Sequence, residues 1–508
     1  MVTKVIGTSA TKTQSFRQDS PIAARLDSAQ RRNLSVEILA RTEPIVRLAD
    51  RLGVSRKFCY RQAAKASEAL DEAFEPSAPD EKVLFHVPVT KDWLRQFVLA
   101  QVLIGHTSFR GVMEIIEAVF DYRRISIGTI HNIVRDTVSE ARLVNDAQDL
   151  SDIHVGAHDE IYQTGQPVLV GADVRSTYCY LLSAEEHCDE ATWGVRLLEK
   201  SDQGLRPDYT IADGGQALRA GQAAAWEDVP CHGDVFHAER ELGKLAFCLT
   251  NRAAGCTRTR QKIERKMERI RRSGKTQNRS LACKLKSARK AEAQAVALAE
   301  DLRTLAGWMK DDILSLAGPD LADRRELFDF VVAELCRCEA FDSRRIRPVR
   351  RRLQWQRENL LAFVGILDER FADMAMGMKV SSALVHGVCE LQGMDRNRPA
   401  YWRREAQLRQ RLRHNFHRVQ TAVREVLAET PRASSIVENL NSRLRNYFFL
   451  RRHIGNEYLD LLRFFLNHRR FVRSDRPERV GKSPAELLTG KPHPHWLEVL
   501  GFERFRRN

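Results

Sequence analysis

The chain has 508 residues, of which 43% are hydrophobic and 29% charged, a composition typical of a soluble protein with roughly three or four domains. Lysines and arginines outnumber acids by 82 to 67, and the resulting net charge of +15 favours nucleic acid as the partner. No run of about 18 apolar residues could span a bilayer, and the first residues lack the apolar core of a secretory signal, so we expect a cytoplasmic, nucleoid-associated protein without a membrane segment.

Residues 1–30 form a predicted flexible basic arm, and the segment after it has the pattern of two helices separated at Gly53. We expect a helix-turn-helix domain over residues 31–75, in which Ser55 caps the second helix. An ordinary helical hairpin is the alternative that the same pattern allows. The outer side chains of the second helix, expected to contact DNA, are Arg56, Lys57, Tyr60 and Arg61.

A linker is predicted at residues 75–82, and a second helical unit follows over residues 83–145. From Ser126 onwards the sequence again has the pattern of a capped helix after a short turn. We therefore expect a second, helix-turn-helix-like DNA-binding domain. The side chains available to point outwards from its last helix are His131, Asn132 and Arg135.

After residue 150 the pattern becomes that of a sheet. Three consecutive segments are alternating or apolar and rich in β-formers, and a helix, a strand, a helix, a short strand and a further helix follow them. The resulting order over residues 150–250, β-β-β-α-β-α-β-α, resembles that of a ribonuclease H-like domain. The first three predicted strands lie within residues 153–163, 167–176 and 177–186.

Residues 251–430 have an almost entirely helical pattern with three strongly basic stretches. Residues 258–290 hold fourteen lysines and arginines against two glutamates, which fits either a solvated coiled coil or a DNA-binding surface. The other two stretches, 343–357 and 401–418, each place a tryptophan among arginines, and whether these rings are core residues or stack on bases stays open. The candidates for DNA contact here are Arg350, Arg351, Arg352 and Trp355.

Two aspartates in the predicted sheet are candidates for catalysis. Asp159 lies in the middle of the first strand and Asp213 ends the fourth, and these strands are neighbours at the centre of such a sheet. Clustered carboxylates repel each other unless cations neutralise them, and hard oxygen ligands suit Mg²⁺ or Mn²⁺. Two such ions can activate an attacking oxygen and stabilise a leaving one in phosphodiester transfer. Glu160 or Asp173 as the first ligand, in place of Asp159, remains an alternative.

A third carboxylate is expected from Glu438, at the start of a predicted helix. Ser435 and Glu438 have the Ser-x-x-Glu spacing of a capping box, which would hold the turn from which Glu438 projects. Arg445 follows seven residues later, nearly two helical turns, so it shares a stripe with Glu438 and could hold a phosphate.

Taken in order, these features resemble the catalytic domain of a DDE transposase. The similar subgroup has a ribonuclease H-like core split by a large helical insertion before the last glutamate, as in Mutator-like, hAT-type and related bacterial insertion-sequence enzymes. Asp159, Asp213 and Glu438 match the acidic triad, and Arg445 matches the basic residue often found seven positions after the glutamate. Residues 481–490 resemble the closing segment of many bacterial transposases and integrases.

Asp234 and His237 resemble the Cys/Asp-x-x-His signature of those families, and we expect them to have a structural or DNA-positioning role near the active site. A zinc site that includes Cys231, His232 and His237 is the alternative. The ten cysteines form no spaced pair of Cys-x-x-Cys motifs, which argues against structural zinc and predicts free thiols.

The resemblance implies a multidomain α and α/β protein. Its N-terminal helix-turn-helix domains would precede a ribonuclease H-like mixed-sheet core, residues 150–250 and 431–508, split by the basic all-α insertion 251–430. The implied activity is binding of terminal repeats, cleavage of double-stranded DNA and joining of the freed 3′-OH to target DNA, with two Mg²⁺ or Mn²⁺ ions and a homodimer or larger oligomer. Two alternatives stay open: a helix-turn-helix regulator with a catalytically inert scaffold, and a ribonuclease H-like nuclease without strand transfer.

Overall fold

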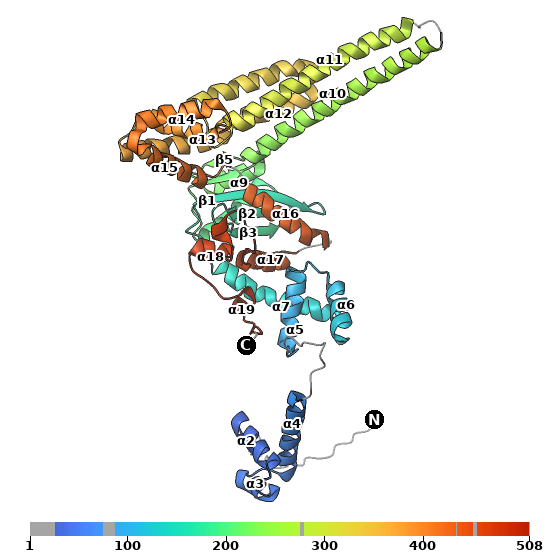
Figure 1. Ribbon diagram of the computed structural model, residues 1–508, viewed down its shortest axis with the longest axis vertical. Coiled ribbons are helices and arrows are strands. Elements are labelled where there is room, and N and C mark those ends of the chain that lie inside the picture. The colour runs from blue at the N-terminus through green and yellow to red at the C-terminus, as the bar shows by residue number, and fades with distance from the viewer. Residues whose placement is uncertain (1–25, 75–86, 275–278, 433, 451–454, 507–508) are drawn as a thin grey trace, which may run out of the picture. The chain divides into compact units, whose positions relative to one another are not determined.

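The protein is mostly helical and contains a mixed five-stranded sheet (Figure 1). In this computed structural model the chain divides into two compact units, residues 1–87 and 88–506. Residues 1–25 of the expected basic arm and the expected linker 75–82 lie outside the described residues. No helix in the described part of the chain is long and apolar enough to cross a membrane, and all ten cysteines are free thiols. The described residues are 26–74, 87–274, 279–432, 434–450 and 455–506.

The first unit is a small bundle of three helices around one apolar core. Gly53 separates the second helix from the third, and its φ of 61° lies in the left-handed region that glycine adopts without strain. The backbone N–H of Phe58 donates to Ser55 Oγ at 3.2 Å, so Ser55 caps the third helix as predicted. The helices are α2 (Ser28–Leu39), α3 (Ile45–Leu52) and α4 (Arg56–Phe74).

Three helices at the start of the second unit share a hydrophobic core with the sheet. The Tyr447 hydroxyl donates to the carbonyl oxygen of Leu103 at 2.7 Å, and the Asn145 amide donates to that of Asp460 at 2.9 Å. Residues 88–146 are therefore part of the same compact unit as the sheet. These helices are α5 (Lys91–Leu103), α6 (Phe109–Phe120) and α7 (Ile127–Asp146).

The strands follow the predicted chain order and form a sheet in the order β3-β2-β1-β4-β5. β1 pairs antiparallel with β2 and parallel with β4, so the first and fourth strands are neighbours as expected. His158 of β1 pairs with Ala212 of β4, which brings the next residues of both strands, Asp159 and Asp213, close to one another. The strands are β1 (Val155–Gln163), β2 (Gln166–Asp173), β3 (Cys179–Ala184), β4 (Tyr209–Ala212) and β5 (Cys231–Gly233).

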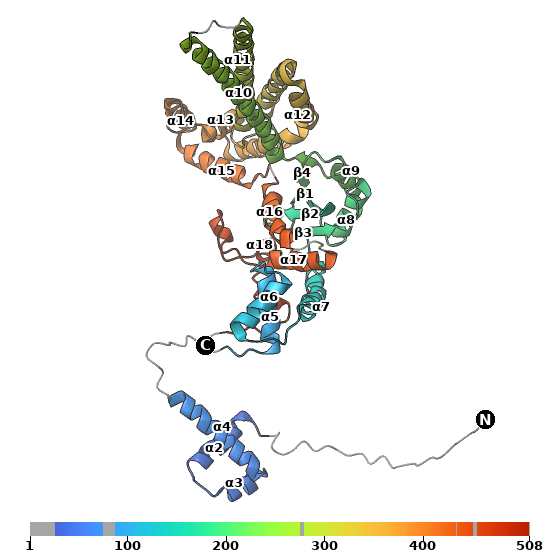
Figure 2. The ribbon, with the colours of Figure 1, turned by 90° about the vertical axis from the view of Figure 1, so that its right-hand side faces the viewer.

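Helices cover both faces of this sheet (Figure 2). Alternation along β2 sends Leu169 to one face and Val168 and Val170 to the other, because successive side chains of a strand point to opposite sides. The Leu169 face packs on α8 (Glu190–Asp202) and α9 (Gln216–Ala225). The opposite face packs on α16 (Ser435–Leu450) and α17 (Asn456–His468), and the short helices α18 (Pro484–Thr489) and α19 (Trp496–Val499) follow.

Close packing of α8 on α9 leaves no room for a side chain at Gly221. A Cβ there would lie 2.5 Å from the Cβ of Trp193 and 2.6 Å from the carbonyl oxygen of Glu190. Neither atom can move without shifting α8, so Gly221→Ala is expected to lower the free energy of unfolding by about 1–3 kcal/mol in chemical denaturation. Gly243→Ala is the control, because no atom of another described residue lies within 4 Å of a Cβ at Gly243. Equal destabilisation by both changes would contradict the packing argument.

Between β5 and α16 the chain forms an all-helical region with its own hydrophobic core. α10 begins at Val235, directly after β5, and continues without a break to Arg272, so the boundary expected at residue 251 falls inside one helix. α10 and α11 form a long hairpin (Figure 1). The helices are α10 (Val235–Arg272), α11 (Arg279–Trp308), α12 (Leu321–Met378), α13 (Ser382–Gly393), α14 (Pro399–Leu412) and α15 (Phe416–Glu429), with a π-helical turn η1 (Met309–Ile313) and a short 3-10 turn η2 (Arg413–Asn415).

Candidate metal centre

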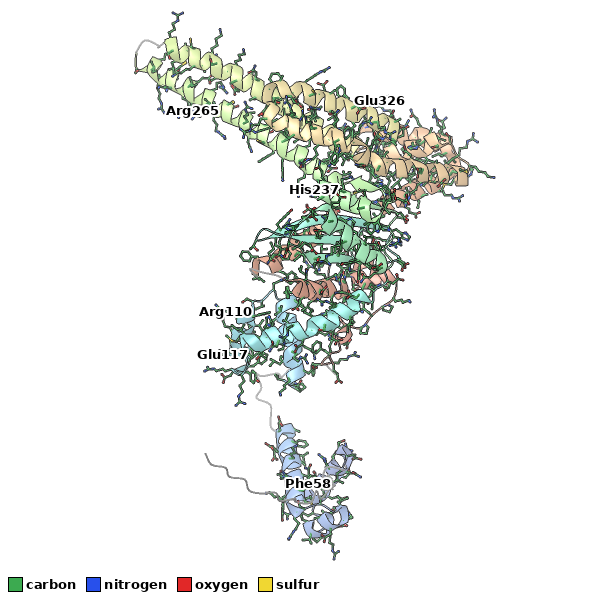
Figure 3. All side chains as sticks on the ribbon, turned by 180° about the vertical axis from the view of Figure 1, so that it is seen from behind. Phe58, Arg110, Glu117, His237, Arg265 and Glu326 are labelled. Carbon is green, nitrogen blue, oxygen red and sulfur yellow. The ribbon has the colours of Figure 1, made fainter. Side chains whose placement is uncertain are left out.

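Three side chains from distant parts of the sequence meet on the α16 face of the sheet. Asp159 lies in the middle of β1, Glu438 in the first turn of α16 and His237 in the first turn of α10. Each offers a possible ligand atom, and these atoms lie within 4.8 Å of one another. The side chains of His237 and Glu438 are 19% and 17% exposed, so the group is sheltered but reachable. Figure 3 shows His237 at the end of α10 next to the sheet.

Asp234 brings the two ends of the helical region together. It caps α10, where its Oδ1 accepts from the backbone N–H of Phe236 at 2.9 Å and from that of Ser434 at 3.2 Å. Its Oδ2 accepts from the Ser434 hydroxyl as well. Burial alone would raise the pKa of Asp234, but hydrogen bonds from His237 and Ser434 outweigh burial and lower it. Because Ser434 directly precedes α16, this one carboxylate aligns the first turn of α10 with the first turn of α16.

His237 stands between two carboxylates. Its Nδ1 lies 2.5 Å from Asp234 Oδ2, and its Nε2 lies 3.2 Å from Glu438 Oε1. The hydrogen bond to Asp234 raises the pKa of His237. Metal-bound histidines commonly donate their second ring N–H to a carboxylate, which fixes the ring and its tautomer. Asp234 thus orients His237 so that Nε2 is directed at the other ligand atoms.

Glu438 lies in the first turn of α16, where its carboxylate forms an ion pair with Arg240. Arg240, one turn along α10 from His237, donates from Nη1 to Glu438 Oε1 at 3.0 Å. α16 begins at Ser435, and the Glu438 N–H donates to the carbonyl oxygen of Ser434 at 3.0 Å. Ser435 is therefore inside the helix and not in the capping position that was expected. The serine hydroxyl before the helix, that of Ser434, bonds Asp234 instead.

Asp159 is a partly buried carboxylate close to two other carboxylates and to His237. Its Oδ1 accepts from the backbone N–H of Glu160 at 2.9 Å, and its Oδ2 accepts from the Asn441 amide at 2.7 Å. Burial raises the pKa of Asp159 to about 6; the hydrogen bond from Glu160 and the charge of His237 act against this rise, and the charges of Asp213 and Glu438 add to it. A negative charge at Asp159 is thus costly, and a cation bound beside it would relieve that cost.

Asn441 belongs to this site although it was not predicted. It is fully buried one turn after Glu438 on α16, and its Oδ1 has no hydrogen-bond partner in the part of the chain that the structure describes. A buried unpaired oxygen costs about 1–3 kcal/mol, and an ion or a water bound at this atom would relieve that cost. The i, i+3 spacing from Glu438 is the sequence signal that could have identified it.

Asn441→Leu is expected to weaken divalent-metal binding while the fold is retained. Leucine is similar in size but cannot donate to Asp159, and losing such a supporting hydrogen bond typically costs about 10–100-fold in metal affinity. Titration calorimetry with Mn²⁺ measures the change. Asn446→Leu, on the exposed side of α16, is the matched control. Unchanged Mn²⁺ affinity in folded Asn441→Leu would remove Asn441 from the site.

Asp213 lies beside this group without being one of its three members. Its Oδ1 accepts from the backbone N–H of Gly215 at 2.8 Å, which holds the turn after β4. It is close enough for its charge to raise the pKa of Asp159. α12 packs on this turn, since a Cβ at Gly214 would clash with the Gln356 side chain and lie 3.7 Å from the Trp355 ring. Two of the three expected carboxylates therefore meet directly, and His237 completes their group.

The alternative ligands lie elsewhere. Glu160 points to the opposite face of β1, where its Oε1 accepts from Trp193 Nε1 at 3.2 Å. Asp173 is buried at the end of β2 and accepts from the backbone N–H and hydroxyl of Ser176 at 2.7 and 2.5 Å. His232 stacks on Tyr209 with ring centroids 4.3 Å apart. Neither His232 nor its neighbour Cys231 belongs to the group of ligand atoms found among the described residues.

The predicted DNA-contacting side chains are mostly exposed. Trp355 is 56% exposed and is therefore not a core residue. Arg350 is half-buried and its Nε lies 2.5 Å from Glu339 Oε1, while Arg352 pairs with Glu241. The other predicted residues, all exposed, are Arg56, Lys57, Tyr60 and Arg61 on α4, His131, Asn132 and Arg135 on α7, Arg351 on α12 and Arg445 on α16.

Comparison with known proteins assigns no family: the sequence matches no protein-family model and is significantly similar to no curated protein. What this site can bind therefore follows from the chemistry of its donor atoms. Two carboxylates suit Mg²⁺ or Mn²⁺, and an imidazole adds a nitrogen donor of the kind that Zn²⁺ and Fe²⁺ also accept. The residues present thus fit a divalent cation, with a third carboxylate, Asp213, close by.

Proposed function

We propose that the protein is a DDE-type DNA transposase of the bacterial insertion-sequence kind. It would bind the terminal repeats of its element, cut the DNA with water and join the freed 3′-OH to target DNA. The observation that carries the proposal is that Asp159 and Glu438, far apart in sequence, meet together with His237, and that a third carboxylate, Asp213, lies close to Asp159. The strand order β3-β2-β1-β4-β5, with β2 antiparallel to its neighbours, supports a ribonuclease H-like core interrupted by the helical region.

In this proposal Asp159, Asp213 and Glu438 would hold two Mg²⁺ or Mn²⁺ ions, with His237 as a further donor. Bound ions of this kind activate an attacking oxygen and stabilise a leaving one in phosphodiester transfer. The chain's own contribution is to hold the donors in place. The Asn441 amide orients Asp159, and the Gly215 N–H orients Asp213.

The remaining surfaces fit double-stranded DNA. α3 and α4, separated at Gly53, would act as a helix-turn-helix in which the exposed, basic side of α4 contacts the terminal repeat. The exposed side of α7 would add a second contact. A transposase must hold two DNA ends together, so we propose a homodimer or larger oligomer that works on nucleoid DNA.

The test is incubation of the full chain with linear duplexes that carry the element's ends, in Mg²⁺ or Mn²⁺. The ends are identified in the DNA that flanks the gene, as inverted repeats bounded by short target duplications. Joined products support the transposase. Cleavage without joining would assign a nuclease, and binding without cleavage in either metal would assign a regulator with an inert scaffold.

A further inference from the structure

The α10–α11 hairpin carries a row of cations far from the candidate metal centre. Arg258, Lys262, Arg265 and Arg269 follow one another at spacings of four, three and four residues, which places them on one face of α10. All four are exposed, and none forms an ion pair with any described residue. We call this row the α10 stripe.

The glutamates near the stripe are already engaged elsewhere. Glu264 pairs with Arg260 and Arg289, and Glu268 pairs with Arg271 and Arg272. The stripe is therefore left as uncompensated positive charge within a stretch that has fourteen cations and two acids between residues 258 and 290. Like charges along one helix face repel each other, so a polyanionic ligand would stabilise this surface.

The hairpin is braced, so the stripe has a defined position. Arg260 Nε of α10 lies 2.6 Å from Glu292 Oε2 of α11, and Arg289 Nη2 of α11 lies 2.9 Å from Glu264 Oε1 of α10. Nearer the sheet, residues of α10 and α11 share one buried core. The two helices thus form an arm and not a pair of independent segments.

A single helix connects this arm to the candidate metal centre. His237 lies in the first turn of α10 and the stripe lies on its far half, as Figure 3 shows for His237 and Arg265. At 1.5 Å per residue, the stripe begins about 32 Å and ends about 48 Å from His237 along the helix axis. In duplex DNA, at 3.4 Å per base pair, this reach corresponds to about 9–14 base pairs.

We propose that the α10 stripe binds the phosphate backbone of the duplex about 9–14 base pairs from the phosphodiester on which the candidate metal centre acts. A straight row of cations on a braced helix fits the regular charge of a duplex backbone and makes no use of base identity. The inference rests on the proposed function, because it takes DNA to be the substrate of that centre.

The test uses the full chain with Arg258, Lys262, Arg265 and Arg269 all replaced by glutamine. DNA-binding affinity is measured at several salt concentrations on duplexes that carry the element's ends. The DNA on one side of the cleavage position is varied in length from 5 to 25 base pairs. The wild type should bind more tightly once this DNA is longer than about 9–14 base pairs. We call this rise in affinity the length step, and the variant should lack it. For the variant, the slope of log Kd against log salt concentration should be smaller than for the wild type by about 3–4, as expected for four lost phosphate contacts.

Two control variants distinguish the effect of losing charge in the stripe from the effects of altered folding or of lower net charge. A variant with lysine at the three arginines of the stripe keeps the charge and should behave as the wild type. Replacing Arg473, Arg476, Lys482 and Lys491 by glutamine removes the same charge from exposed positions near the C-terminus and should leave the length step intact. A length step that persists in the glutamine stripe variant would overturn the proposal. So would a changed oligomeric state with unchanged DNA binding, which would assign the hairpin to contact with a second copy of the chain.

The two proposals fail separately. Wild-type protein that binds longer duplexes more tightly but neither cleaves nor joins DNA would keep the stripe as a phosphate-binding surface, and would remove both the transposase assignment and the distance from a cleaved phosphodiester. Wild-type protein that cleaves and joins without the length step would keep the assignment and remove the stripe.

Discussion

Glu438→Gln is expected to abolish DNA cleavage and strand transfer, with a loss in rate on the order of 10³-fold or more, which corresponds to about 4 kcal/mol of transition-state stabilisation. Glutamine has nearly the same size and can still accept from Arg240 Nη1, now 3.0 Å from Glu438 Oε1. It lacks the charge that would make Glu438 a ligand for a divalent cation, so the fold and DNA binding should survive while the chemistry is lost. Single-turnover rates of cleavage and joining measure the effect.

The control for this change is Glu425→Gln, at an exposed position on α15. It removes the same charge without touching the candidate metal centre, and its rates should equal those of the wild type. A cleavage rate for Glu438→Gln within tenfold of the wild type would exclude Glu438 as a metal-binding carboxylate and would leave it with its contacts to His237 and Arg240 alone.

Asp234→Ala is expected to lower both the melting temperature and the metal affinity. The carboxylate is buried and accepts from the N–H groups of Phe236 and Ser434, the Ser434 hydroxyl and His237 Nδ1. Removal of a helix cap costs about 1 kcal/mol, and a single buried donor left unpaired costs about 1–3 kcal/mol, so a loss of at least about 2–4 kcal/mol in unfolding free energy is expected. Released from Asp234, His237 loses its orientation, and Mn²⁺ affinity should fall by about 10–100-fold.

Thermal unfolding and Mn²⁺ titration test the two effects separately. Asp228→Ala, at an exposed position before β5, is the control and should change neither quantity. Asp234→Asn should lie between the wild type and Asp234→Ala in stability, because an amide oxygen can still accept from the backbone of Phe236. If Asp234→Ala were destabilised but bound Mn²⁺ as tightly as the wild type, Asp234 would be a fold residue only.

The sequence alone determined those parts of the protein whose signals are local. Period-two alternation and β-formers predicted the strands in their order, and the break at Gly53 with the cap at Ser55 predicted the boundary between α3 and α4. The acids at the middle of β1 and the end of β4 could be expected to approach, since these strands are neighbours. Such features depend on residues a few positions apart, so one chain is enough to detect them.

Only the tertiary structure decided which side chains join the two carboxylates. Asp234 and Ser434 are 200 residues apart, and no local pattern connects them, yet their hydrogen bonds align α10 with α16. That alignment brings His237 to Glu438 and turns Asn441 towards Asp159. It also uses the serine hydroxyl that could have capped the helix of Glu438. A hydrogen bond between distant segments forms only after both have packed on the sheet, which is why the residue types alone could not predict which side chains would meet.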